Sequence, residues 1–224
     1  MKDRAEPDLV ERYLEQAVRF VPHGGGGALR VAATLVTCRL AVLLLDAMAM
    51  PPEPASGYRY VNVHNPDCPL RFDAAARRWR CPAALAEHPA WGINWAGARL
   101  LCQRLGARLP TASEWERFAA NDTPERAYPW GDAPPDPERA NYDEHYGGTT
   151  EVGRFAPTEI GLFDVAGNLG EWCLDRHEPG TSLERVGKGG AWSKDARHLR
   201  IATSRGKWGR LGTTTIGLRP VWGD

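Results

Sequence analysis

Residues 161–172, Gly-Leu-Phe-Asp-Val-Ala-Gly-Asn-Leu-Gly-Glu-Trp, constrain the fold of this chain more than any other segment. A short apolar run at 162–165 leads into Gly167-Asn168, and the chain then continues to Trp172. Glycine and asparagine are the residues that tolerate a positive φ, so this pair predicts a sharp turn without steric strain at Cβ. The pattern therefore predicts a tight turn within apolar surroundings.

Asn168 and Glu171 are polar side chains in this apolar setting, which Trp172 and Trp192 extend. An unpaired carboxylate would be costly there, so both side chains need partners. Two oxygen-bearing side chains and the carbonyls of a turn can bind a hard cation, and the metal expected at Asn168 and Glu171 is a structural Ca²⁺. The alternative is that both side chains bond to backbone N–H groups. The sequence leaves both interpretations open.

Several motifs on either side of this turn occur in a fixed order. They are Arg-Leu-Pro-Thr-Ala-Ser-Glu-Trp-Glu at 108–116, Tyr-Pro-Trp-Gly-Asp at 128–132, Ala-Asn-Tyr at 140–142, Gly-Gly-Ala-Trp at 189–192 and Ile-Gly-Leu-Arg at 216–219. Together with 161–172 they resemble the formylglycine-generating-enzyme-type (sulfatase-modifying-factor) domain, a branch of the C-type lectin fold. The resemblance implies an α+β fold with small antiparallel sheets, two or three core helices and much irregular structure, as one domain over residues 1–224. A shared fold does not by itself imply an activity.

Composition argues against several classes of protein. Of the 224 residues 42% are hydrophobic and nine are tryptophan, which is enough for a core. No run of 18 apolar residues is present, so no membrane span is expected. The formal net charge is zero, which gives no long-range attraction to nucleic acid, and no specific nucleic-acid motif is found. The N-terminus lacks the apolar segment of a signal peptide, so a cytoplasmic protein is expected.

The five cysteines are scattered and odd in number, and none forms a Cys-x-x-Cys pair. A zinc cluster is therefore not expected, and reduced thiols are the default in a cytoplasmic protein. A disulfide between Cys68 and Cys81, around one predicted hairpin, stays open.

Apolar periodicity and capping residues predict three helices and two strand regions. The helices are expected at 7–20 (with a strand from Val18 as the alternative for its end), at 37–48 and at 95–105. Thr111-Ala-Ser-Glu114 fits a capping box and begins a further helix, with Glu114 also paired to Arg108. Strands are expected at 58–63 and as a hairpin of 70–73 with 78–81.

Residues 121–146 are rich in Pro, Gly, Asp and Asn and predict a long ordered loop. Asn141, Asp143 and Glu144 make a second group of oxygen ligands within it. The family resemblance implies Ca²⁺ near the matching asparagine, Asn141.

Residues 188–219 interleave apolar and glycine positions with a varied set of side chains. The varied set is Ser193, Lys194, Asp195, His198, Ile201, Thr203, Ser204, Lys207, Trp208, Arg210, Leu211, Thr213 and Thr214. A scaffold interleaved with unrelated side chains suits a ligand-binding surface. An ordinary solvated loop is the alternative, but Trp208 and Leu211 argue against it because they would be exposed without a partner.

The resemblance also bears on catalysis. It implies that enzymes of the family use a cysteine pair in the C-terminal segment, yet this chain has no cysteine between Gly189 and Arg219. The six histidines show no i,i+4 pair, so no redox metal is expected. The size and C-terminal layout most resemble the variable protein of a diversity-generating retroelement, with 189–219 as the variable region.

The leading interpretation is therefore a non-enzymatic protein that binds an unknown protein or other macromolecular ligand. The alternative is an oxidoreductase of the formylglycine-generating type that acts on a peptide or small molecule. A third possibility is a module of a larger assembly that docks through the first helix.

Overall fold

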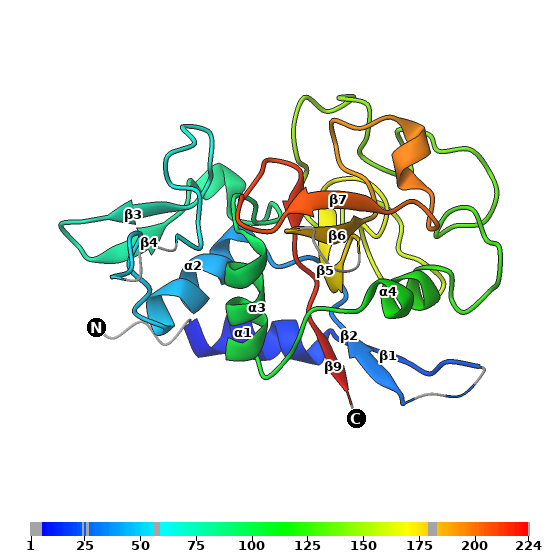
Figure 1. Cartoon of the computed structure of the whole chain (residues 1–224), viewed down its shortest axis with the longest axis horizontal. Helices are drawn as coiled ribbons and strands as arrows, with labels where there is room; N and C mark the ends of the chain where they lie inside the picture. Colours follow the sequence, from blue (N-terminus) through cyan, green and yellow to red (C-terminus); the bar gives the residue numbers. More distant parts are fainter. Residues whose placement is uncertain (1–5, 24, 26, 56–58, 179–182, 224) are drawn as a thin grey trace.

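A computed structural model describes residues 6–23, 25, 27–55, 59–178 and 183–223 of the chain (Figure 1). The helices are α1 (Glu6–Glu15), α2 (Cys38–Ala47), α3 (Trp95–Arg104) and α4 (Ala112–Ala119), with short 3-10 helices η1 (Ala83–Leu85) and η2 (Ala196–Leu199). The strands are β1 (Val18–Phe20), β2 (Leu29–Val31), β3 (Arg71–Asp73), β4 (Arg78–Arg80), β5 (Gly170–Arg176), β6 (Glu184–Lys188), β7 (Arg205–Trp208), β8 (Ile216–Gly217) and β9 (Val221–Gly223).

The helices begin where the capping residues predict. The Thr37 hydroxyl accepts a hydrogen bond from the Leu40 backbone N–H at 3.2 Å, which fixes the start of α2. The capping box of α4 is complete, with Thr111 and Glu114 each accepting from the other's backbone N–H at 3.1 and 2.8 Å. Helix α1 ends at Glu15 rather than near residue 20, because the chain from Val18 pairs as a strand. The strand alternative for that end is therefore confirmed.

Three small sheets support an α+β fold, as expected. The first has the order β1-β2-β9 and joins the N-terminal hairpin to the last strand. The second is the predicted hairpin β3–β4. The third has the order β7-β6-β5-β8, and it departs from a purely antiparallel arrangement because β5 and β8 pair in parallel.

Strand β5 separates two hydrophobic clusters. Trp172 packs with α2, α3 and the β3–β4 hairpin, whereas the next residue, Cys173, packs with α4 and the β1–β2 sheet. This alternation follows from the period of two along a strand. A central strand that is buried on both faces is a rigid base for the segments that follow it.

Three expectations need correction or limits. Residues 59–63 form no strand, because Val61 makes only an isolated bridge to Ile93; Tyr58, the start of the predicted strand, lies outside the described residues. All five cysteines are free, so the Cys68–Cys81 disulfide is not formed. None of the helices in the described part of the chain combines the length and apolar character needed to cross a bilayer.

Candidate ligand-binding surface

The turn at 167–168 forms as predicted and joins three of the sequence motifs. Gly167 and Asn168 have φ values of 83° and 58°. The Gly167 N–H donates to the Gly189 carbonyl at 2.8 Å, and the Asn168 N–H donates to the Asn141 carbonyl at 2.8 Å. The bend thus connects the loop around Asn141 to the start of the C-terminal segment.

Glu171 forms a buried ion pair with Arg219, and neither side chain is exposed to solvent. The guanidinium donates to the carboxylate from Nε at 2.9 Å and from Nη2 at 2.8 Å. The Trp115 indole N–H adds a third hydrogen bond to the carboxylate at 2.8 Å. Arg219 also donates to the carbonyls of Ala32 and Ala33, both at 2.8 Å. The pair therefore joins the turn motif and the end of the C-terminal segment to the N-terminal part of the chain.

Asn168 is fully buried and bonds to the backbone of Thr150. Its Oδ1 accepts from the Thr150 N–H at 3.0 Å, and its Nδ2 donates to the Thr150 carbonyl at 3.1 Å. These contacts are of the kind that the hydrogen-bond alternative specified for Asn168. For Glu171 the partner is a side chain, Arg219, and not the backbone that the alternative specified.

Other buried oxygens around the turn lack protein partners. Among the described residues, Asp164 Oδ1, Asn141 Oδ1 and Thr150 Oγ1 are buried without a hydrogen bond. Burial raises the pKa of Asp164 to about 6. Sequence reasoning missed Asp164, although an acid within the apolar run at 162–165 was a signal. Asp143 and Glu144 are exposed, unlike Asn141, so the second predicted oxygen group does not come together.

Calcium at Asn168 and Glu171 stays a prediction that chelation tests. An unchanged melting temperature in EDTA would favour the alternative without metal, in which the Arg219 guanidinium supplies the counter-charge of Glu171. A bound cation would instead give a lower melting temperature in EDTA that added CaCl₂ restores, because a ligand of the native state stabilises it. Magnesium added at the same concentration controls for ionic strength.

The C-terminal segment runs along η2, β7 and the loop that follows β7 (Figure 1). All of its varied side chains except one are partly or fully exposed: Ser193, Lys194, Asp195, His198, Thr203, Ser204, Lys207, Trp208, Arg210, Leu211, Thr213 and Thr214. The interleaved scaffold positions Leu199, Ile216 and Leu218 are fully buried. The scaffold positions Gly190, Trp192 and Ala196 are partly exposed, so varied and apolar positions correspond to outside and inside over only part of the segment.

Ile201 and Ala202 reverse this pattern. Ile201, placed on the ligand-binding surface from the sequence, is 5% exposed and packs in the cluster that contains Phe118 and Val186. Ala202, placed in the scaffold, is exposed. The Ile201 N–H donates to the Ala127 carbonyl at 2.9 Å, and this contact with a distant loop turns the isoleucine side chain inward. Ile201 is therefore not part of the candidate surface.

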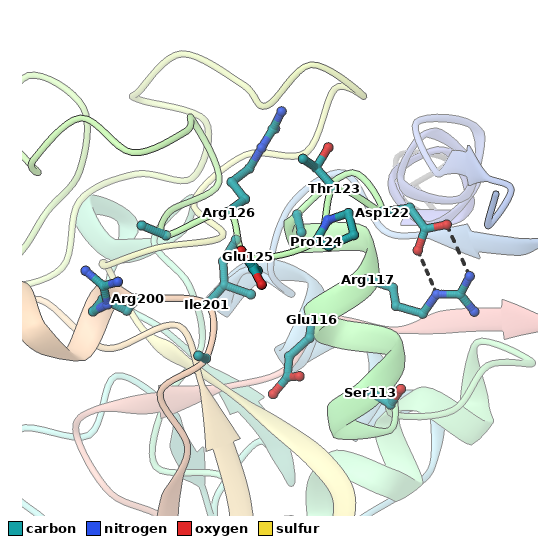
Figure 2. Close-up of a pocket in the computed structure, with 13 residues that line it drawn as sticks. Ser113, Glu116, Arg117, Asp122, Thr123, Pro124, Glu125, Arg126, Arg200 and Ile201 are labelled. Atoms are coloured by element: carbon teal, nitrogen blue, oxygen red, sulfur yellow. Dashed lines mark hydrogen bonds and ion pairs between the residues drawn. The ribbon is translucent and has the colours of Figure 1, made fainter. Parts of the chain in front are cut away.

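A cavity of about 360 Å³ adjoins the segment, and sequence reasoning missed it. Ser113 and Glu116 of α4 lie on one side, and Arg200 and Ile201 lie on the other (Figure 2). Arg117 and Asp122 form an ion pair at 2.8 Å at its edge, which lowers the pKa of Asp122 to about 2. Its lining comes from α4, residues 122–127 and residues 200–202. Because these segments are far apart in the sequence, no local motif predicts the cavity.

The cysteines form no reactive pair. Cys173, directly after the turn motif, is buried, and burial raises its pKa well above the usual value for a thiol. Burial likewise raises the pKa of Cys38 and of Cys102. Protonated thiols are poor nucleophiles and poor metal ligands, so burial makes these three cysteines less reactive than exposed thiols.

Comparison with known families decides the affiliation of the chain. The sequence profile of the sulfatase-modifying factor enzyme 1-like domain matches residues 55–223. The chain belongs to this family. The match includes the turn, the ion pair and the whole C-terminal segment, as the motif resemblance implied.

Relatives of this sulfatase-modifying-factor-type chain have different names and lengths. It is 34% identical over 133 residues to the serine/threonine-protein kinase pkn1 of Chlamydia pneumoniae, covering 52% of this chain and 21% of the relative. It is 29% identical over 164 residues to the formylglycine-generating enzyme of Thermomonospora curvata, covering 57% and 54%. It is 28% identical over 165 residues to the inactive C-alpha-formylglycine-generating enzyme 2 of Bos taurus, covering 63% and 54%. The chain therefore spans at most about half the length of these relatives.

Solved structures share the fold of this sulfatase-modifying-factor-type chain. Treponema denticola variable protein 1 aligns with a TM-score of 0.63 at 19% identity, covering 87% of this chain and 84% of that protein. CarF aligns with a TM-score of 0.66 at 20% identity, covering 88% and 87%. The P3c variant of the Major Tropism Determinant aligns at 0.52 and 14%, covering 92% and 54%. At these identities the alignments establish the fold, which is the C-type lectin-like fold expected from the motifs.

Proposed function

We propose that the chain is a non-enzymatic ligand-binding protein whose C-type lectin scaffold displays a diversified surface, as in the variable proteins of diversity-generating retroelements. The observation that carries this proposal is that every varied side chain of the C-terminal segment except Ile201 is at least partly exposed, while Leu199, Ile216 and Leu218 hold the segment in the core. The fold shared with a protein named variable protein 1 supports it. The ligand would be a protein or another macromolecule.

An exposed apolar group marks where such a ligand would make its main contact. Trp208 is 58% exposed, and Leu211 and Leu183 are each 55% exposed. Trp208 lies opposite Glu184 in the β6–β7 pair, and the Gly209 N–H donates to the Leu183 carbonyl at 3.2 Å, so the three residues share one end of the sheet. Large apolar side chains exposed together are typical of an interaction surface.

Replacing Trp208 and Leu211 together with alanine should weaken capture of the ligand by roughly thirtyfold or more, because buried aromatic anchors at an interface contribute about 2 kcal/mol or more each. The measurement is the dissociation constant of a ligand isolated on the immobilised chain. Val21→Ala is the matched control, because Val21 is also an exposed apolar residue, at 49%, but lies beyond β1. Equal affinity of the double variant and wild type would contradict the proposal.

Diversification itself has a separate test in the neighbouring DNA. A near-copy of the codons for residues 189–219 that differs at adenines, beside a reverse transcriptase reading frame, is the expected finding. Its absence would remove the diversified part of the proposal and leave only ligand binding.

An oxidoreductase of the formylglycine-generating type is the second candidate, favoured by the 29% identity to a protein of that name. The absence of cysteine after Gly189 argues against it, because thiolates are the ligands that hold Cu(I). Copper or iron retained after purification, together with oxygen uptake on a cysteine peptide, would support this candidate instead.

A further inference from the structure

Lysines are rare in this chain, and those that the structure describes gather in one place. The sequence has Lys2, Lys188, Lys194 and Lys207, and Lys2 lies outside the described residues. The other three line a single small hollow on the β7-β6-β5-β8 sheet. We call this hollow, with Lys188, Lys194, His198, Arg205, Lys207 and Thr215 in its wall, the lysine hollow.

The lysine hollow is small and has glycine in its wall. Its volume is about 20 Å³, which is room for one water-sized group. A Cβ on Gly187 would lie 2.9 Å from Ile216 Cδ1 and 3.4 Å from Lys207 Cγ. Because Gly187 has no side chain, the aliphatic part of Lys207 can lie over it.

Lys207 occupies this hollow without an acidic partner. Its Nζ donates to the Thr215 hydroxyl at 3.0 Å, and in the part of the chain that the structure describes no carboxylate pairs with it. Burial, followed by the charges of Lys194 and Arg205, lowers the pKa of Lys207. An ammonium has three donor hydrogens, so Lys207 retains donor capacity for a further acceptor.

The acids nearest the hollow already have other partners. Glu116 accepts from Lys188 Nζ at 2.6 Å, and this lysine is fully buried. Asp195 pairs with Arg197 at 2.7 Å and with His198 at 2.9 Å. Glu184 lies 3.9 Å from His177. The charges of Lys194, Arg205 and Lys207 are therefore left without a carboxylate among the described residues.

We propose that the lysine hollow binds one carboxylate group of the ligand, and that the ligand is therefore a protein segment with an exposed acidic side chain. This inference rests on the proposed ligand-binding function and names the chemistry of its partner. A carboxylate oxygen fits the water-sized space and supplies the negative counter-charge that the Lys207 ammonium lacks. Trp208, the next residue of β7, points to the other face of the strand and does not line the hollow, so the charge alone defines this site.

A polyanion such as nucleic acid fits these observations less well. The formal net charge of the chain is zero, and two residues of the hollow's wall, His198 and Lys188, are paired with Asp195 and Glu116, whose charges disfavour an extended phosphate backbone beside it. A single carboxylate can avoid these acids by inserting between Lys194 and Lys207.

Lysine-selective labelling of the full chain tests the proposal directly, because the sequence contains so few lysines. The probes are acetyl-Glu-Leu-Trp-amide, the matched peptide with Gln for Glu, and inorganic phosphate. We expect the acidic peptide to shift the side-chain NMR signals of Lys194 and Lys207 saturably and to raise the pKa of Lys207. The signal of Lys188, which already has Glu116, should stay unchanged. Equal shifts with the Gln peptide, or tighter binding of phosphate than of the acidic peptide, would overturn it.

Variants give a second, independent measurement. Lys207→Met keeps the apolar stem and removes the charge, and it should weaken binding of the acidic peptide by about tenfold or more, since a charge-assisted hydrogen bond is lost. Arg12→Met is the matched control, because Arg12 is an exposed cation on α1, at the opposite side of the molecule (Figure 1). Melting curves test whether both variants fold. If Lys207→Met does not fold, Lys194→Met takes its place, and the same loss of binding is expected.

The two proposals fail in different ways. If the ligand isolated on the chain binds Lys207→Met and Lys194→Met as it binds wild type, but no longer binds after loss of Trp208 and Leu211, the lysine hollow is wrong and the binding function stands. If neither set of changes affects capture of the ligand, the proposed function is wrong as well.

Discussion

Replacing Arg219 with methionine is expected to destabilise the fold by roughly 3–5 kcal/mol, because the Glu171 carboxylate would remain buried without its counter-charge. Both side chains are fully buried, and the guanidinium donates to the carboxylate and to the carbonyls of Ala32, Ala33 and Phe163. The measurement is the free energy of unfolding from urea titration at neutral pH.

The double variant Glu171→Gln with Arg219→Met is the informative companion. Removing the charge at Glu171 as well should restore part of the lost stability, since no isolated charge remains inside. Arg200→Met, at an exposed arginine of the same segment, should change stability by no more than about 0.5 kcal/mol. A single Arg219 variant as stable as the Arg200 variant would show that the pair does not hold the segment.

Replacing Gly167 with alanine is expected to cost roughly 3 kcal/mol or more, for two separate reasons. The φ of 83° disfavours any residue with a Cβ by about 1–2 kcal/mol. The added Cβ would also overlap the Asn141 carbonyl oxygen and lie 3.1 Å from the Asn141 carbonyl carbon, and backbone atoms cannot move aside as a flexible side chain can.

Gly147→Ala separates these two causes. Gly147 has a φ of 68°, and a Cβ there would meet nothing within 4 Å, so only the backbone cost of about 1–2 kcal/mol is expected. Urea titration gives the free energy of unfolding of both variants. The difference between their losses is the cost of the contact between the added Cβ and the Asn141 carbonyl. Equal losses in the two variants would contradict the assigned contact.

Local chemistry made parts of the fold predictable from sequence. Thr37 and Thr111 mark the starts of α2 and α4 because a cap acts on N–H groups only two or three residues away. The bend at Gly167-Asn168 was likewise evident, since positive φ is a property of the residues themselves. The requirement of Glu171 for a partner followed from its apolar surroundings.

Contacts between distant segments could not be predicted from the sequence. Nothing in the sequence assigns Arg219 to Glu171 or Lys188 to Glu116, because each pair joins segments whose spacing depends on the finished fold. Ile201 was misplaced for the same reason, as a bond to the Ala127 carbonyl turns it inward. The parallel β5–β8 pairing and the 360 Å³ cavity also arise from tertiary packing alone.

The buried pair of Glu171 and Arg219 has a consequence for chain length. It closes residues 172–218 into a loop whose two ends are fixed by charge, independently of what lies between them. The entropic cost of a longer closed loop rises only slowly, by about 0.6 kcal/mol for each doubling. We therefore expect relatives that keep this ion pair to differ in the length of the segment between β5 and β8 as well as in its side chains.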